Sequence, residues 1–286
     1  MRTAINLLKH VNWSARLGLA VIVINVACAF FAPWVAPYSE TEVVGDVWEP
    51  VMWSAEAVPH NPPVILGTDQ LGRDLFSRLM YGARNTIGLA LVTTALAFGV
   101  GALLGFLAAT MKGWVDMLLS RGVDILMAFP TLIFALVVLS VMGTSTTVLI
   151  VVIALIGATR VYRISRAVAM DIEVMEYVES ARLRGEGLWW VMKDEILPNA
   201  LSPLVAEFGL RFCFVFLFIS ALSFLGLGLQ PPTADWGSMV RENAAAISFG
   251  ILTPLIPAAA IALLTVGLNL VVDWFLHKAS GIKDVP

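Results

Sequence analysis

Six long apolar runs constrain this chain more than any other feature of its sequence. They lie at residues 17–36, 86–109, 123–142, 146–161, 203–229 and 251–276. A helix needs about 20 apolar residues to cross the roughly 30 Å hydrocarbon core of a bilayer, and a shorter run can be completed by flanking side chains that snorkel. Since only 14% of all residues are charged, the sequence predicts an all-α integral membrane protein with six transmembrane helices.

Basic residues predict which side of the membrane each segment faces. If the N-terminus is cytoplasmic, most Lys and Arg residues fall in cytoplasmic segments, and the outer segments hold only Arg73, Arg78, Arg84 and Arg241. The positive-inside rule therefore predicts a multi-pass protein with both termini cytoplasmic. Residues 1–36 could alternatively be a cleaved signal peptide, but the apolar run continues past its weak cleavage site, which favours an uncleaved anchor.

The chain is expected to have two parts. Residues 1–84 hold the cytoplasmic N-terminus, the first transmembrane helix and a long extracytoplasmic loop. Residues 85–286 form a five-helix core that carries a cytoplasmic loop at 171–200. The outer loop is rich in proline and acidic residues over 37–66, which predicts irregular structure without indicating its role.

Local patterns add three structural expectations. Asp69 is expected to cap an amphipathic surface helix that precedes the second span, because apolar residues follow it at helical spacing. A second short surface helix is expected at Gly237–Ala246. Gly101 and Gly105 form a G-x-x-x-G pair, which predicts close packing of two helices.

The loop at 171–200 is charged although apolar spans flank it. Its sequence EYVESARLRGEGLWWVMKDEILPNALSP, residues 176–203, predicts two short amphipathic helices joined at Gly185, with Pro198 ending the second and Pro203 at the mouth of the fifth span. The apolar faces could dock into a groove on another protein or pack back on the chain's own helices. Periodicity does not choose between these alternatives.

The segment ESARLRGEGLWWVMKDEILP resembles the EAA loop of ABC-importer permeases. Glu195 departs from the pattern at a position that is usually apolar, but the spacing from Gly185 to Pro198 is retained. The resemblance implies that the loop forms a coupling helix seated in a cleft of a cytoplasmic ATPase. The residues expected to carry this coupling are Glu179, Ser180, Ala181, Gly185, Leu188, Leu197 and Pro198.

Three further segments resemble dipeptide/oligopeptide/nickel-type permeases, and specifically the C-type subunit of their usual pair. They are LGTDQLGRDLFSRLMYGAR, DILMAFPTLIFALVV and ALSFLGLGLQPPTADWG. This resemblance implies a type I ABC importer permease fold in a bacterial inner membrane. It also implies a second homologous permease subunit, two cytoplasmic ATP-binding subunits and an extracytoplasmic substrate-binding protein as partners. Dipeptides or oligopeptides are the expected cargo, with nickel, opines or other small solutes as alternatives.

The sequence contains no motif for chemistry of its own. It has no G-x-x-x-x-G-K-[ST] phosphate loop, and its three histidines are scattered. We therefore expect no enzymatic activity, cofactor or metal in this chain, with ATP and Mg carried by the partner ATPases, and the net charge of −3 gives no reason to expect nucleic acid. An independent secondary carrier is the alternative from another class, and it would need ion-coupling acids near the membrane midplane.

Polar residues in the fifth span are the candidates for a translocation path. Glu207 and Arg211 are four residues apart, in the favourable order for a helical ion pair. A charged side chain at this depth costs about 2.5–3.5 kcal/mol unless it is paired or hydrated. The pair could face the path and meet a substrate carboxylate, or it could be purely structural. Phe212 lies next to it as a candidate gate residue.

Overall fold

The computed structural model describes residues 12–279, in which helices make up nearly all of the regular structure. These residues form two compact units: unit 1 comprises 12–91, 143–146 and 216–274, and unit 2 comprises 92–142, 147–215 and 275–279. Some of the charged residues used for the orientation lie outside the described residues, namely Arg2, Lys9 and Lys283.

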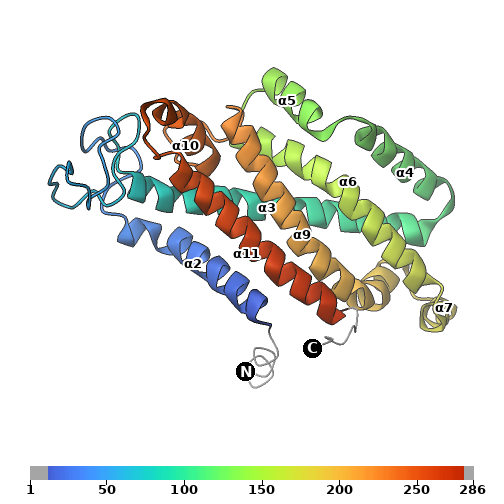
Figure 1. Cartoon of the computed structure of the whole chain (residues 1–286). Helices are drawn as coiled ribbons and strands as arrows, with labels where there is room; N and C mark the ends of the chain where they lie inside the picture. The colour runs from blue at the N-terminus through green and yellow to red at the C-terminus, as the bar shows by residue number, and fades with distance from the viewer. Residues whose placement is uncertain (1–11, 280–286) are drawn as a thin grey trace. The chain divides into compact units, whose positions relative to one another are not determined.

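Five helices in the described part of the chain are long and apolar enough to cross a membrane (Figure 1). A bent pair, α4 and α5, raises the count to six if the pair is one span. The all-α class and, on that count, the six spans are confirmed. The spanning helices are α2 (Trp13–Val35), α3 (Leu75–Met111), α6 (Thr146–Glu173), α9 (Leu197–Phe224) together with the segment that leads into it, and α11 (Leu255–Ala279).

The predicted span over 123–142 is not one continuous helix but parts of two. α4 (Gly113–Ala128) and α5 (Thr131–Met142) meet at an angle of 87°. Pro130 lies at the break, and Phe129 before it is extended, with φ −83° and ψ 136°. Proline lacks an N–H and disfavours helical geometry in the residue that precedes it. The bend therefore follows from the proline in the sequence, although the hydropathy pattern alone does not reveal it.

The predicted surface helix before the second span is also not separate, because α3 runs unbroken from Leu75 to Met111. Its first turn is capped by Asp74 rather than by Asp69: the Asp74 carboxylate accepts the N–H of Ser77 at 2.8 Å. Asp69 instead lies in the preceding turn, where it accepts the N–H of Leu71 at 2.8 Å. No proline and no glycine with positive φ interrupts α3, so the helical hydrogen bonds continue into the span.

In unit 1, α2 packs on α11 and a short helix covers the start of α3. A Cβ at Gly18 of α2 would lie 2.5 Å from the carbonyl oxygen of Gly267, so these helices approach closely. The predicted surface helix at Gly237–Ala246 is confirmed as α10 (Trp236–Glu242) followed by a 3-10 turn (Ala244–Phe249). The buried Trp236 indole donates a hydrogen bond to the Leu79 carbonyl at 2.9 Å, which fixes α10 against α3.

In unit 2, α3 packs on α6 at the predicted glycine pair. A Cβ at Gly101 would lie 2.6 Å from the Ala158 carbonyl oxygen, and one at Gly105 would lie 2.8 Å from that of Tyr162. The close packing expected of these glycines is confirmed. α6 continues past the arginines that end the fourth apolar run near 161, and Arg163 pairs with Asp124 of α4 at 2.7 Å.

Gly105→Ala is expected to destabilise unit 2, because the new methyl group would overlap the α6 backbone. Overpacking of this kind costs about 1–3 kcal/mol. Gly99→Ala on the same helix is the matched control, since a Cβ there meets nothing within 4 Å. We expect a lower thermal unfolding midpoint in detergent for Gly105→Ala and an unchanged midpoint for Gly99→Ala. Equal midpoints for the two variants would contradict the packing described above.

Candidate coupling site

The loop at 171–200 begins with a short helix that ends in a glycine turn. α7 (Glu176–Leu183) follows α6 after a two-residue break, and Gly185 beyond it has φ +85°. The N–H of Gly185 bonds the Arg182 carbonyl at 2.9 Å, and that of Glu186 bonds the Ala181 carbonyl at 3.2 Å. This is the Schellman geometry that glycine adopts with little strain. The predicted helix stop at Gly185 is confirmed.

The second predicted helix of the loop is not separate from the fifth span. α8 (Leu188–Trp190), a π-helical segment (Val191–Ile196) and α9 follow one another without a break, so Pro198 does not end a helix and Pro203 lies inside α9. In the π-helical segment, the N–H of Leu197 reaches back five residues to the Met192 carbonyl. In a regular α-helix, the ring of a proline clashes with the carbonyl group four residues earlier. The wider π-helical spacing shifts the carbonyl groups before Pro198, so that the helix can continue through this proline.

One face of the loop packs back on unit 2. Val178 and Ala181 of α7 are fully buried, and Val178 belongs to a core cluster built from α3, α6, the π-helical segment and α9. The other face remains open: Leu183 is 83% exposed and Trp189 is 64% exposed. The alternative in which the loop packs back on the chain's own helices is therefore confirmed for one face, and docking of the other face on another protein stays a prediction.

The residues expected to carry coupling are divided between these faces. Ala181 is buried, and Leu188 is partly buried. The remaining five are exposed: Glu179, Ser180, Gly185, Leu197 and Pro198. Arg184, at the end of α7, connects this helix to the second half of the loop. Its guanidinium stacks on the Trp190 ring at 5.7 Å and lies 3.9 Å from Glu195.

Glu173, at the end of α6, is a site residue that sequence reasoning missed. Its side chain is 4% exposed and pairs at 2.6 Å with Lys112, which follows α3, and at 2.6 Å with Arg182 of α7. We call these three residues the Glu173 cluster. It ties the ends of α3 and α6 to α7. In the sequence Glu173 looks like any acid of a charged loop, and the nearby Asp171 is exposed.

The predicted path residues form a buried pair in α9. Arg211 donates to the Glu207 carboxylate through Nε at 3.2 Å and also through Nη2, and both residues are 8% exposed. The adjacent Phe212 is 9% exposed. The ion pair expected from the i, i+4 spacing is thus formed, and the role of all three residues in a path stays a prediction.

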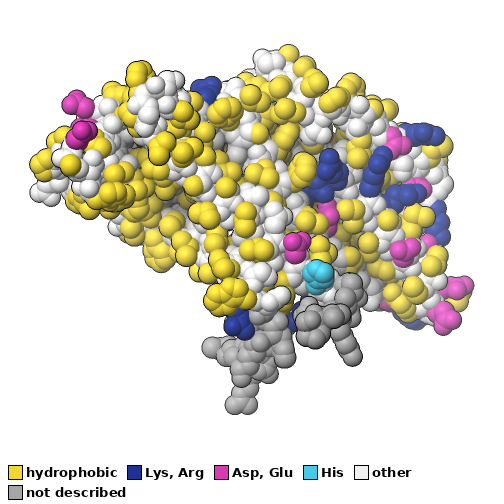
Figure 2. Space-filling view, in the orientation of Figure 1, with side chains coloured by type: hydrophobic (Ala, Val, Ile, Leu, Met, Phe, Trp, Pro, Cys, Tyr) yellow, Lys and Arg dark blue, Asp and Glu magenta, His cyan; other side chains and the backbone are white. Residues whose placement is uncertain are grey.

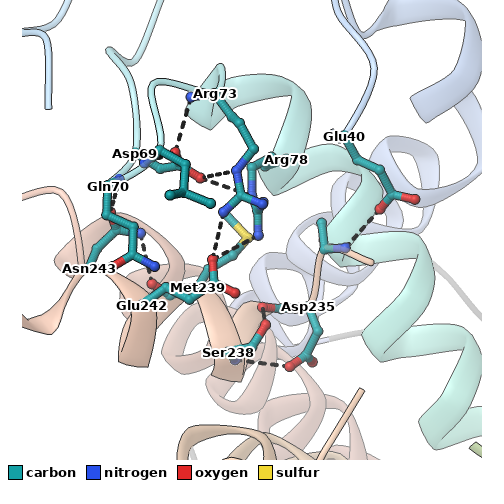
Figure 3. A network of polar contacts seen from close by, with 12 residues as sticks. Glu40, Asp69, Gln70, Arg73, Arg78, Asp235, Ser238, Met239, Glu242 and Asn243 are labelled. Carbon is teal, nitrogen blue, oxygen red and sulfur yellow. Dashed lines mark hydrogen bonds and ion pairs between the residues drawn. The ribbon is translucent and has the colours of Figure 1, made fainter. Parts of the chain in front are cut away.

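A second polar site lies in unit 1, where the loop before α3 meets α10 (Figure 3). Arg73 pairs with Asp69 at 2.7 Å and with Glu242 at 2.8 Å, and Arg78 pairs with the same two acids at 3.4 and 3.0 Å. We call these four residues the loop–α10 network. Each side chain is at most 8% exposed, so two buried positive charges and two buried negative charges balance.

Neutral hydrogen bonds extend the loop–α10 network. The Asn243 side-chain oxygen accepts the indole N–H of Trp48 at 3.1 Å and the backbone N–H of Gln70 at 3.0 Å, so the loop is fixed to the end of α10 (Figure 3). Burial raises the pKa of Asp74 and of Asp235, which cap α3 and α10. These contacts show that the irregular loop is held in a defined position on unit 1.

Charged side chains of both signs also gather on unit 2 around α4 and α7, as Figure 2 shows, and they differ from the apolar surface of the adjoining helices. Arg166 of α6 forms a two-pronged contact with Asp116 of α4, at 2.5 and 2.6 Å. In the described residues, no group of three or more His, Cys, Asp or Glu side chains is placed to hold a metal ion.

Comparison with known proteins places these features in context. A family model described as "Binding-protein-dependent transport system inner membrane component" matches residues 101–278, and one described as "N-terminal TM domain of oligopeptide transport permease C" matches residues 10–48. The di/tripeptide transport system permease protein DppC of Pseudomonas aeruginosa is 35% identical over 96% of this chain and 87% of its own length.

Other relatives cover the chain to a similar extent. The glutathione transport system permease protein GsiD of Pectobacterium atrosepticum is 31% identical over 96% of this chain and 86% of its own. Among solved structures, an amino acid ABC transporter crystallised with histidines matches with a TM-score of 0.50 at 20% identity, over 70% of this chain and 94% of that one. That likeness bears on the fold alone.

Proposed function

Because the chain belongs to the family of binding-protein-dependent transport system inner membrane components, we propose that it forms half of an import path for short peptides. It is a permease subunit of an ABC importer, embedded in the inner membrane. The peptide cargo is supported by curated relatives that are named as di/tripeptide, dipeptide or glutathione permeases. Nickel, opines or other small solutes are the alternative cargo.

The proposed assembly contains a second homologous permease, two ATPase subunits that bind ATP and Mg, and an extracytoplasmic binding protein. Both termini and the loop at 171–200 face the cytoplasm in this proposal, and the loop meets an ATPase. The observation that carries it is the set of large apolar side chains exposed on a charged loop, of which Val174, Leu183 and Trp189 are the most exposed. Large apolar groups exposed in this way mark interaction sites.

Coupling follows from this arrangement by population shift. ATP binding draws the two ATPases together, and each pulls a loop that is anchored to the ends of α3 and α6 through the Glu173 cluster. The ATP-bound state then favours one arrangement of the spans over the other, because it binds that arrangement more tightly. In unit 1, the loop–α10 network holds the extracytoplasmic loop in a fixed conformation, which offers a defined surface to the binding protein.

Co-purification tests the assembly, and uptake tests the cargo. The tagged chain, extracted in mild detergent, is expected to bring down a second six-span protein and ATP-binding subunits that mass spectrometry identifies. The complex in liposomes, with its binding protein, is expected to accumulate labelled dipeptides only when ATP is supplied. Assembly with uptake of another solute and no peptide would reject the cargo, whereas ATP-independent transport by this chain alone would reject the importer.

Reversing the charge of Glu179 tests the docking face of the loop. Glu179→Arg is expected to abolish ATP-driven uptake and to weaken attachment of the ATPases in co-purification, because a like charge placed across an interface costs several kcal/mol. Asp171→Arg, at an exposed acid of α6, is the control and is expected to keep at least half of the uptake. Normal uptake in Glu179→Arg would exclude α7 as the docking helix.

A further inference from the structure

Arg160 has an unusual position in α6. It is preceded by fourteen of the helix's 28 residues and lies at the end of the apolar run 146–161. The arginines on the next two turns are paired, Arg163 with Asp124 and Arg166 with Asp116. Arg160 is exposed and has no acidic partner among residues 12–279, and its guanidinium stacks on the Phe214 ring of α9 at 4.9 Å.

The neighbourhood of Arg160 carries an unbalanced positive charge. Arg211 lies 5.9 Å from the same Phe214 ring, but Glu207 neutralises it. One net positive charge therefore remains beside Phe214. A charged side chain without an acidic partner is stable only where it meets water or an anion.

A small cavity opens beside this arginine. It has a volume of about 60 Å³ and lies between the bend of α4 and α5 and the middle of α6. Arg160 and Thr159 supply its polar wall, and Phe129 and Phe134 contribute to its apolar wall. Since one water needs roughly 10–15 Å³ by this measure, the space suits a carboxylate with one or two waters. It is too small for a whole peptide.

We propose that Arg160 binds the free C-terminal carboxylate of the peptide as the cargo passes through this subunit. The proposal rests on the peptide cargo put forward above and adds a residue that recognises one end of it. A guanidinium offers two parallel N–H donors that match both oxygens of a carboxylate. Phe214 holds the guanidinium plane by stacking, and the apolar wall strengthens the charged contact by excluding water.

The test uses the assembled importer with its binding protein in two kinds of liposome, one of zwitterionic lipid alone and one that also contains anionic lipid. Uptake is measured for a dipeptide with a free C-terminus and for the same dipeptide with a C-terminal amide, and the affinity of the isolated binding protein for both cargoes is measured separately. The variants are Arg160→Gln and Arg160→Lys. Arg163→Gln is the matched control, since it removes a positive charge one turn further along α6.

Losing one charge-assisted, bidentate contact is expected to lower uptake of the free-acid dipeptide about tenfold in Arg160→Gln. Uptake of the amide should be unchanged, so that the acid-to-amide ratio falls to the value set by the binding protein. Arg160→Lys should recover only part of the loss, and Arg163→Gln should keep the wild-type ratio. Assembly should be normal in all three variants, and basal ATP hydrolysis should be unchanged in Arg163→Gln.

Three outcomes would overturn the carboxylate site at Arg160, and a fourth would overturn the peptide cargo. An unchanged acid-to-amide ratio in Arg160→Gln would reject the carboxylate site while leaving the importer intact. Loss of assembly in that variant would assign Arg160 to the interface with the second permease. A defect seen only with anionic lipid, and equal for both cargoes, would assign it to a lipid headgroup. If the wild-type complex assembles but transports no peptide at all, the proposed cargo itself is wrong.

Discussion

Glu242→Gln is expected to release the loop before α3 from unit 1 and to abolish transport. Glu242 pairs with both Arg73 and Arg78, and all three side chains are at most 8% exposed. Neutralising it leaves a net positive charge buried in the loop–α10 network. Removing one partner of a buried ion pair costs about 3–5 kcal/mol, so local opening should become about a hundredfold more frequent or greater. Limited proteolysis of residues 36–74 in solubilised protein measures this opening.

Two variants control this prediction. Glu56→Gln removes an exposed acid from the same loop and is expected to leave its cleavage rate unchanged. The double variant Glu242→Gln/Arg73→Gln restores the charge balance, so it should regain part of the protection that the single variant loses. Wild-type protection in Glu242→Gln would mean that the network does not hold the loop. An equal loss in single and double variants would mean that charge balance is not the reason.

Glu173→Gln is expected to uncouple ATP hydrolysis from transport. Without the carboxylate, Arg182 of α7 loses its ion pair to α6, and Lys112 at the end of α3 loses its partner too. α7 is then held on unit 2 by the packing of Val178 and Ala181. Hydrogen bonds to charged groups are worth about 1.5–3 kcal/mol, less here because Lys112 and Arg182 are 62% and 41% exposed. We expect the peptide transported per ATP hydrolysed to fall about tenfold in proteoliposomes.

Asp171→Asn is the control for this variant, because Asp171 is an exposed acid two residues earlier on α6. It should keep the wild-type ratio of transport to hydrolysis. If α7 is held less firmly on unit 2, the ratio of transport to hydrolysis falls while the ATPase subunits still co-purify. Misfolding would instead lower the yield of the whole complex. An unchanged ratio in Glu173→Gln would show that the Glu173 cluster has no part in coupling.

The positions of the spans could be predicted from the sequence, since each of the six apolar runs overlaps a helix or the bent pair. Their ends were less predictable. α3 begins at Leu75 rather than near 86, α6 continues beyond Arg160, and α9 is continuous with the loop before Pro198. In each case hydrogen bonds of the helical backbone continue through polar residues, whereas a hydropathy pattern stops at them.

The candidate site was likewise predictable only in part. The glycine stop at Gly185 and the Glu207–Arg211 pair depend on residues close together in the chain, so local rules predicted both. Glu173 is 61 residues from Lys112, with which it pairs. No spacing rule connects two such positions.

By itself, the sequence determined the membrane class, the approximate spans and the charged loop between the fourth and fifth, because bilayer thickness and helix rise turn hydropathy directly into topology. Only the tertiary structure decided which charges are neutralised. Glu173 and Glu242 are buried and paired with residues far away in the sequence, whereas Arg160 has no acidic partner in the described chain. The physical reason is that the energy of an ionised side chain depends on burial and on nearby opposite charges. Those neighbours are set by the packing of helices that are distant in the sequence.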